Sequence, residues 1–438
     1  MVLGGFTFEV SQPARLSQER AGAIGGSRLR WRRFMASVNP FPALRPQPDL
    51  AVRICELPYD VMSSGEARAL AAGNPLSFLR ISKPEIDLPA DTDPYAPEVY
   101  ARGRDNFCRL IEGGALQSDP RPCFYLYRQV MGTHQQVGLV AVTSCQEYLD
   151  GVIRRHELTR VDKEDDRVRH IEALNAQTGP AFLVYRAETA VDRFVAGRVA
   201  TPPAIDFTAA DGIRHSAWVI ADDAGMEFIR GAFARIPRLY IADGHHRSAA
   251  AGRVFQARQG RGASAWFLSV IFPHNQLQIL PYHRVVSDLN GLSPACLLER
   301  LQALFDIGPA ASASPSHKHV LTLYLAGRWH ELRFRADTLT DLAGLEALDV
   351  TLLQKRVLAP VLGIENPRTS ERISFVGGIR GTDELEKLVN SGAWACAFSM
   401  FPTDISDLMS IADADGIMPP KSTWFEPKLR DGMFCHQI

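Results

Sequence analysis

The sequence has few cysteines and no long apolar run, and both shortages exclude protein classes. Its 438 residues include seven cysteines, an odd number, and no pair has the Cys-x-x-Cys spacing. Scattered cysteines do not build a disulfide scaffold or a structural zinc site, and they fit a reducing compartment. Charges interrupt every apolar run before it reaches the roughly 18 residues of a membrane helix. We therefore expect a cytoplasmic protein with no membrane partner.

The chain also lacks an excess of charge of either sign. Its 48 Lys and Arg residues face 49 Asp and Glu residues, which leaves a net charge of −1 at pH 7. Proteins that bind nucleic acid usually carry a basic excess, and this chain has neither that excess nor a helix-turn-helix pattern. We expect no nucleic-acid partner, so any phosphate site must arise from a local arrangement.

Residues 1–34 differ from the rest of the chain in composition. They contain six arginines and no lysine, and they lack the apolar segment of a secretory signal. We interpret residues 1–34 as disordered or as a mis-called extension ahead of a start at Met35. The alternative is an arginine-rich organellar transit peptide.

The body of the chain interleaves helical and strand patterns. The segment 123–149 has the aromatic and β-branched content of two strands around the turn Gly132-Thr133. Hairpins among βα blocks favour a mixed sheet over a doubly wound parallel one. We predict an α+β fold, a mixed sheet with flanking helices, in three parts: 39–194, 195–335 and 336–438.

The strongest local signal is IADGHHRSAAAGR, from Ile241 to Arg253. A short apolar strand is followed by the turn Asp243-Gly244 and then by a helix that begins at His245. The free N–H groups of a helix's first turn, placed at a strand end, form an anion site. We assign phosphate binding to Gly244, His245 and Arg247, because the forked guanidinium of arginine matches phosphate oxygens.

The two consecutive histidines in this segment diverge on a helix. Their side chains point about 100 degrees apart, so one of them at most faces a ligand. We assign His246 and Asp243 to catalysis. In the alternative interpretation Asp243 only caps the helix and both histidines are solvated.

The same residues carry a family resemblance. GHHRSAA resembles the phosphate-binding turn of the ParB/sulfiredoxin superfamily, which includes nucleases, CTP-binding partition proteins, sulfiredoxins and free-serine kinases. From about 39 to 429 the chain resembles a prokaryotic family known as domain of unknown function 1015. The matching blocks are NPFPALRP, ELPYDV, RRHELT, YIADGHHRSAAA, PYHRVV and MPPKSTWFEPKL.

The resemblance implies a ParB/sulfiredoxin-like core with an additional C-terminal α/β region. It also implies a nucleotide-handling kinase like the serine kinases, with ATP or ADP and Mg²⁺ as cofactors. His245 stands where a sulfiredoxin carries its nucleophilic cysteine, so sulfiredoxin chemistry is excluded.

A kinase needs a base for the acceptor hydroxyl. Glu157 in RRHELT is our candidate base, with His156 beside it to set its pKa. The alternative is a surface glutamate that is ion-paired with neighbouring arginines.

Three further segments supply candidates for ligand contacts. Tyr59 and Asp60 in LPYDV are assigned to the substrate, where Asp60 could instead cap the helix that begins near Ser63. Lys421 follows two prolines, which have no N–H for a phosphate loop but hold the lysine rigidly. Arg284 in PYHRVV is placed near the phosphates, with pairing to Asp243 as its alternative use.

No metal site is predicted, since Asp243, His245 and His246 are too close in sequence to surround one ion. We interpret Arg167 as one member of an i,i+4 side-chain pair along its own helix rather than as a ligand contact. Two functions remain open: phosphoryl transfer to a small hydroxylated metabolite, or nucleotide binding by a non-catalytic regulatory protein. The acceptor, the nucleotide and the oligomeric state, a homodimer included, stay undetermined.

Overall fold

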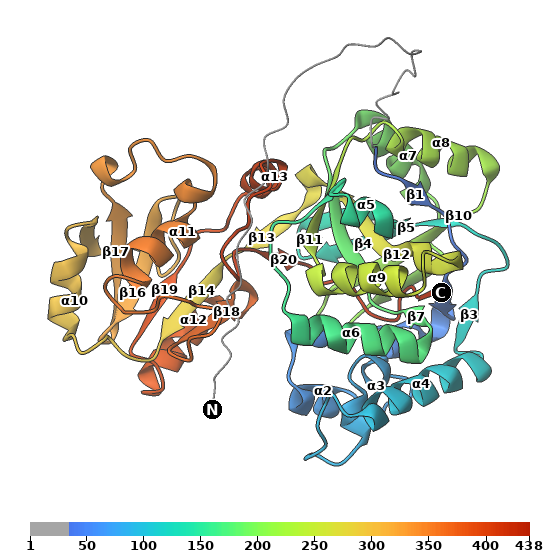
Figure 1. Ribbon diagram of the computed structural model, residues 1–438, viewed down its shortest axis with the longest axis horizontal. Coiled ribbons are helices and arrows are strands. Elements are labelled where there is room, and N and C mark those ends of the chain that lie inside the picture. The colour runs from blue at the N-terminus through green and yellow to red at the C-terminus, as the bar shows by residue number, and fades with distance from the viewer. Residues whose placement is uncertain (1–34) are drawn as a thin grey trace, which may run out of the picture. The chain divides into compact units, whose positions relative to one another are not determined.

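A nine-stranded sheet organises the chain from Val38 to Pro273 in the computed structural model, which describes residues 35–438 (Figure 1). The strand order is β6-β11-β8-β12-β5-β4-β10-β9, with β1 beside β5. The strands are β1 (Val38–Asn39), β4 (Phe124–Met131), β5 (His134–Ser144), β6 (Ile153–Arg154), β8 (Ala181–Tyr185), β9 (Ile205–Thr208), β10 (Arg214–Ile220), β11 (Leu239–Asp243) and β12 (Trp266–Pro273). The prediction about residues 1–34 lies outside the described residues.

The sheet is mixed, as the hairpin pattern predicts. The pairs β6–β11 and β8–β12 are parallel, and the remaining pairs are antiparallel. β4 and β5 form the predicted hairpin, and Gly132 in its turn has a φ of 59°. The α+β prediction, with a mixed sheet and flanking helices, is confirmed.

Central strands of this sheet are buried on both faces. Val137 to Val142 are all buried in consecutive positions of β5. An added Cβ on Gly138 would lie 2.6 Å from Val270 Cγ1, so β5 and β12 approach as closely as they do only with glycine there.

Helices pack in layers beside the sheet. Figure 1 shows α9 (His245–Ala257) in front of the strands, with α6 (Val161–Leu174) next to it. α6 packs in turn against α4 (Pro97–Glu112), which contacts α3 (Leu79–Ser82). The other α-helices of this part are α1 (Ala51–Ile54), α2 (Ser64–Leu70), α5 (Cys145–Leu149), α7 (Thr189–Val199) and α8 (Asp223–Phe233).

A second sheet has six strands in the order β15-β17-β16-β19-β14-β18, and every pair is antiparallel. Its strands are β14 (Tyr282–Val286), β15 (Phe305–Pro309), β16 (Val320–Leu325), β17 (Arg328–Phe334), β18 (Ile373–Gly377) and β19 (Cys396–Ser399). Its helices include α10 (Pro294–Leu301), α11 (Asp349–Leu353), α12 (Gly381–Asn390) and α13 (Ile405–Asp413). The divisions predicted at 194/195 and 335/336 do not coincide with sheet boundaries, because strands on both sides of each position share one sheet.

The last residues of the chain return to the side of the first sheet, where Gln129 Nε2 of β4 donates to Lys428 O at 2.8 Å, and they pair there in two separate two-stranded sheets. β20 (Trp424–Glu426) pairs with β13 (Gln278–Leu280), and β21 (His436–Gln437) pairs with β7 (Ala176–Gln177). Asp431 forms a bridge with Glu56 between these pairs. This return places C-terminal side chains beside the turn between β11 and α9.

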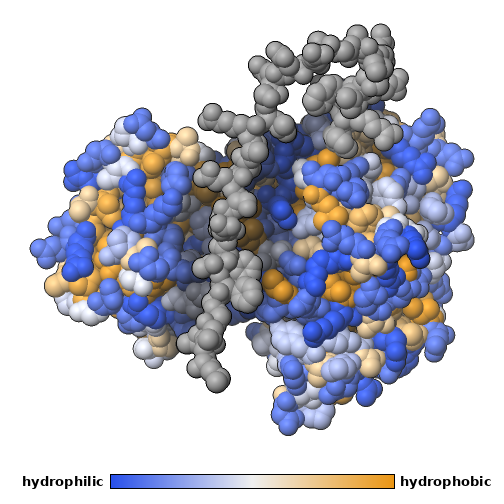
Figure 2. Space-filling model, in the orientation of Figure 1, coloured by the Kyte–Doolittle hydropathy of each residue, from blue (hydrophilic) through white to orange (hydrophobic). Residues whose placement is uncertain are grey.

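The surface in view is mainly hydrophilic. Figure 2 shows apolar residues scattered among polar ones rather than gathered in a band. Within residues 35–438, no helix combines the length and the apolar character needed to cross a membrane.

Candidate functional site

The turn between β11 and α9 forms as the sequence predicts. Gly244 has a φ of 86°, and a Cβ on it would lie 3.2 Å from Ala181 Cα, so both backbone conformation and space require glycine. Asp243 Oδ1 accepts from the Gly244 N–H at 2.7 Å, and its Oδ2 accepts from Lys428 Nζ at 2.9 Å. Burial acts to raise the pKa of Asp243, but the charges of Lys428 and Arg247 hold it below its usual value.

The first turn of α9 leaves three backbone donors without acceptors. Its first backbone hydrogen bond runs from Ser248 N to Gly244 O. Within residues 35–438, no acceptor bonds the N–H groups of His245, His246 or Arg247. These groups carry the partial positive charge of a helix N-terminus, so the turn has the geometry of an anion site.

The two histidines face different surroundings, as their spacing requires. His246 lines a large cavity, and its Nε2 accepts from the Arg160 N–H at 3.1 Å. His245 is buried, and its ring packs edge-on against that of His156 with 4.6 Å between centroids. The alternative of two solvated histidines is therefore wrong.

The cavity beside this turn has a volume of about 660 Å³, within the range of roughly 300–1,000 Å³ that small-molecule sites occupy. It brings together five of the predicted site residues: Tyr59, Asp60, Glu157, His246 and Lys421. Six basic side chains line it: Lys83, Arg160, Lys163, Arg167, Arg368 and Lys421. An anionic ligand suits this lining.

Glu157 lies in the loop that follows β6. Burial raises the pKa of its carboxyl, while the charges of Lys421 and Arg368 act to lower it. His156 does not set this pKa as expected, because its own pKa falls to about 4 through burial and the ring is neutral at pH 7. Pairing with the nearest arginines is not observed either, since Arg154 bonds to Asp415 and Arg160 to Asp162.

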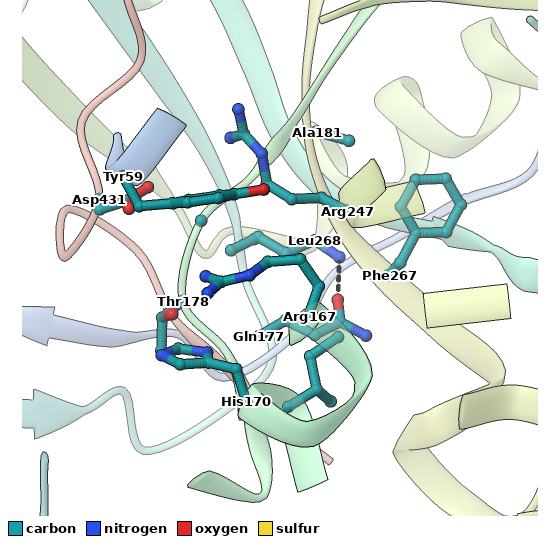
Figure 3. A pocket seen from close by; sticks show the side chains of 12 residues that line it. Tyr59, Arg167, His170, Gln177, Thr178, Ala181, Arg247, Phe267, Leu268 and Asp431 are labelled. Carbon is teal, nitrogen blue, oxygen red and sulfur yellow. Dashed lines mark hydrogen bonds between the residues drawn. The ribbon is translucent and has the colours of Figure 1, made fainter. Parts of the chain in front are cut away.

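A smaller hollow of about 30 Å³ lies beneath Arg247. Figure 3 shows the Tyr59 ring between the guanidinium groups of Arg247 and Arg167, and Arg167 Cζ lies 3.9 Å from the ring centroid. Arg247 Nη1 donates to Pro180 O at 2.6 Å, and its Nη2 lies 3.6 Å from Asp60 Oδ2. Tyr59 and Arg167 line both hollows, so the two adjoin.

The helix after Asp60 is capped by another residue. Ser63 forms a capping box with Glu66 at the start of α2. The expectation that Asp60 caps this helix is therefore wrong, and its carboxylate lines the cavity instead.

Sequence reasoning missed Asp431 and misread Arg167. Asp431 is buried beside Arg247 in the smaller hollow, its Oδ1 has no hydrogen-bond partner, and burial raises its pKa to about 7. Arg167 is not an i,i+4 helix partner but bonds to its neighbour Asp166 and stacks on Tyr59. An Asp-Gly pair two residues after Leu429 is the only sequence signal for Asp431, and turns of that composition are common.

Arg284 is buried in β14. Its Nη2 donates to Lys421 O at 3.1 Å, and burial lowers its pKa to about 10. It does not pair with Asp243, which bonds to Lys428. Arg284 thus contacts the turn of Lys421, and its role at the phosphates stays a prediction.

Lys421 has a φ of 56°, and its Nζ lies 5.3 Å from the Tyr282 ring centroid. Ser422 Oγ donates to Pro419 O at 2.7 Å, which closes the turn of MPPKST. The lysine lines the cavity, and its contact with a ligand stays a prediction.

Comparisons with solved structures find distant neighbours. The chain is similar to a free serine kinase in complex with AMP, with 13% identity, a TM-score of 0.35, and coverage of 66% of this chain and 86% of that chain. It is similar to SbnI with C-terminal truncation from Staphylococcus aureus, with 12% identity, a TM-score of 0.36, and coverage of 68% and 85%. A conserved hypothetical protein from Pyrococcus furiosus shows 13% identity, a TM-score of 0.35, and coverage of 67% and 93%.

Comparisons of sequence identify the family. No curated protein matches the chain. The family model described as "Protein of unknown function (DUF1015)" matches residues 38–351, which include Tyr59, Glu157 and the β11–α9 turn. The block MPPKSTWFEPKL lies beyond the matched residues. The match spans more than half of the sequence, and the chain belongs to the DUF1015 family.

Proposed function

We propose that the protein transfers a phosphoryl group from ATP or ADP to a small hydroxylated metabolite, with the nucleotide phosphates on the first turn of α9. One observation carries the proposal. Among residues 35–438, three backbone N–H groups without acceptors stand at the start of α9, beside a cavity of about 660 Å³ that the half-buried Glu157 also lines.

The charges around the cavity support phosphate binding. Three of the six basic residues of its wall form ion pairs: Lys83 pairs with Glu85, Arg160 with Asp162 and Arg167 with Asp166. Lys421 and Arg368 form no ion pair within residues 35–438, and both act on Glu157. Catalysis of phosphoryl transfer is mainly positioning and electrostatic stabilisation, so unpaired cations that line the same cavity suit it.

Glu157 is placed to act as the base. Burial makes its carboxylate a stronger base than an exposed one, and the nearby Lys421 and Arg368 favour its ionised form. A carboxylate whose pKa is raised by burial, but which nearby cations keep ionised, accepts a proton from a hydroxyl more readily than a surface glutamate does.

Asp60 would hold Mg²⁺ together with the phosphates. Its carboxylate lines the cavity and its side chain is 38% exposed. Mg²⁺ usually binds through one or two carboxylates and substrate phosphates, and it would neutralise charge on the transferred group. The Tyr59 ring, stacked on Arg167, would form the aromatic wall for the substrate.

Glu157→Gln separates binding from turnover. We expect the variant to bind ADP and ATP in calorimetry with nearly unchanged affinity, while phosphoryl transfer to a pool of hydroxylated amino acids falls about a hundredfold, the usual contribution of a positioned base. Glu172→Gln is the matched control, because Glu172 pairs with Arg258 on the outer side of α6. Absence of nucleotide binding by the unmodified chain would contradict the proposal. Binding without turnover would identify a non-catalytic nucleotide-binding regulatory protein.

A further inference from the structure

Two buried imidazoles meet beside the phosphate turn, from segments far apart in the sequence. The parallel pairing of β6 and β11 aligns Ile153 with Leu239 and Arg154 with Tyr240. The two chain segments that follow these strands therefore leave the sheet at the same end. His156 lies in the segment after β6, and His245 lies in the segment after β11. Met418 N donates to His156 O at 2.8 Å and holds the first of these loops in place.

Each of the two rings has a buried nitrogen without a partner. His156 is 1% exposed and His245 is 8% exposed, yet His156 Nδ1 and His245 Nε2 make no hydrogen bond. A buried polar atom without a partner costs about 1–3 kcal/mol, so most such atoms in folded proteins are satisfied by protein, water or a bound ion. Two rings that each carry such an atom lie in contact here, with 4.6 Å between their centroids, and this pair indicates a ligand.

An imidazole binds a metal ion through the lone pair of one ring nitrogen. His156 Nδ1 and His245 Nε2 are the candidate ligand atoms of the two rings, because neither of them makes a hydrogen bond.

Glu157 supplies a third donor. One ligand atom from each of His156, Glu157 and His245 can be chosen so that all lie within 4.8 Å of one another. Donor atoms at about 2.1 Å from a tetrahedral ion lie about 3.4 Å from one another. The three ligand atoms lie within 4.8 Å of one another, so side-chain movements of at most about 1.4 Å bring them to the spacing of a metal site. Glu157 also lines the cavity, which provides a path for an ion and an open position for water or substrate.

Charges of both signs surround this point. Asp243 acts on both His156 and His245, but its carboxylate is already paired with Lys428. Arg155 acts on His245, and Lys421 and Arg368 act on Glu157. The donor atoms and their spacing, rather than the local net charge, indicate the metal ion.

We propose that His156 Nδ1, His245 Nε2 and a carboxylate oxygen of Glu157 bind one divalent transition-metal ion of the Zn²⁺ class, with a further position open to the cavity. Two imidazoles and one carboxylate suit zinc and its first-row neighbours, whereas Mg²⁺ prefers oxygen donors. Three protein ligands with an open position are typical of reactive rather than structural zinc sites. The sequence-based set of Asp243, His245 and His246 contained only one of these ligands.

The test uses the full chain after dialysis against a chelator, with no nucleotide or acceptor present. We expect calorimetric titration with ZnCl₂ to show one ion bound per chain, and MgCl₂ to show none at this site. His156→Phe and His245→Phe remove a ligand atom but keep the ring, and each should abolish this binding. His283→Asn is the matched control: His283 is equally buried in β14, its Nδ1 accepts from Met400 N, and the asparagine oxygen can replace that acceptor.

Cobalt keeps the proposal testable if a variant fails to fold. Co²⁺ added to the unmodified chain should give the visible absorption of a four- or five-coordinate site with nitrogen ligands, and ZnCl₂ should displace it. Absence of one-to-one Zn²⁺ binding by the unmodified chain would overturn the proposal, as would equal binding by the two phenylalanine variants. An ion here takes a lone pair from Glu157, so Zn²⁺ should slow any transfer in which Glu157 is the base. Because metal binding is read without nucleotide, its outcome is independent of the transfer assay.

Discussion

Two aspartates of this chain each face two arginines and a tyrosine, and the two clusters differ in how their polar atoms are satisfied. Asp413 at the end of α13 accepts from Arg238 at 2.6 Å, from Tyr240 at 2.9 Å and from Arg186 at 3.2 Å. Burial acts to raise its pKa, but these hydrogen bonds hold the pKa below its usual value. The first cluster ties α13 to the first sheet.

Asp431 has the same kinds of neighbour in Arg247, Arg167 and Tyr59, but not the same bonds. Its Oδ1 has no partner, and burial raises its pKa to about 7 against the opposing charge of the arginines. Arg247 Nε is also buried without a partner. Identical residue types therefore form a fixed ionic contact in one place and an unsatisfied pocket in the other. The second arrangement is the one expected of a ligand site.

The largest expected difference between the two aspartates is in the pH dependence of stability. With a folded pKa of about 7 and an unfolded value of about 3.9, Asp431 holds an extra proton in the folded chain between these values. The free energy of unfolding should therefore fall by up to about 1.4 kcal/mol per pH unit across this window and then level off. Asp431→Asn does not titrate, so urea unfolding of the variant should lack this decline. Parallel curves for both proteins would contradict the assigned pKa.

Arg247→Lys tests whether the unsatisfied cluster binds anions. A lysine keeps the charge but loses the forked donors, so we expect ADP affinity to fall about tenfold, which equals about 1.4 kcal/mol. Calorimetry with ADP measures the effect. Arg238→Lys makes the same exchange in the Asp413 cluster and should leave ADP affinity unchanged. Equal effects of the two substitutions would remove the distinction between the clusters.

Asp413→Asn tests the satisfied cluster. The variant loses charge-assisted hydrogen bonds from partly exposed arginines, and we expect the free energy of unfolding at pH 7 to fall by about 1 kcal/mol. A lowered pKa contributes stability above the unfolded value near 4, and that contribution is lost only as pH falls below it. The pH effect of Asp413 should thus appear below pH 4, outside the window of Asp431. Thermal unfolding at pH 3 and pH 7 provides the comparison.

Lys421→Met should have the smallest effect on stability. Its ammonium lines the cavity and has no carboxylate partner within residues 35–438, so the change in unfolding free energy should stay within roughly 0.5 kcal/mol. Binding of ADP should nevertheless weaken. Lys387→Met on α12 is the exposed control and should change neither quantity. Unaltered binding in Lys421→Met would show that the turn after Pro420 is structural.

The strand-turn-helix at the phosphate turn was predictable because its causes are local. An apolar strand, a glycine that must adopt positive φ and a run of small helix-forming residues lie within twenty positions of one another. The divergence of His245 and His246 follows from helical geometry alone. The hairpin of β4 and β5 is local in the same sense, since one turn sets its register.

The partners of the site residues were not predictable in this way. Glu157 was expected to respond to the adjacent His156, but its pKa depends on Arg368 and Lys421, which are more than two hundred positions away in the chain. Arg167 was expected to bond along its own helix, but the Tyr59 ring lies against it. Packing between distant segments decides such contacts, and one sequence contains no record of it.

Composition and local pattern were sufficient for the α+β class and for the strand-turn-helix around Asp243 and Gly244. The tertiary structure decided which polar atoms are left without partners. Asp413 and His283 Nδ1 accept hydrogen bonds, whereas Asp431 Oδ1 and His156 Nδ1 have no partner. The reason is physical: the cost of a buried polar atom depends on whether any complementary group packs within hydrogen-bond reach. For Asp413 those groups are Arg186, Arg238 and Tyr240, and for His283 the group is the Met400 N–H, all distant in the sequence.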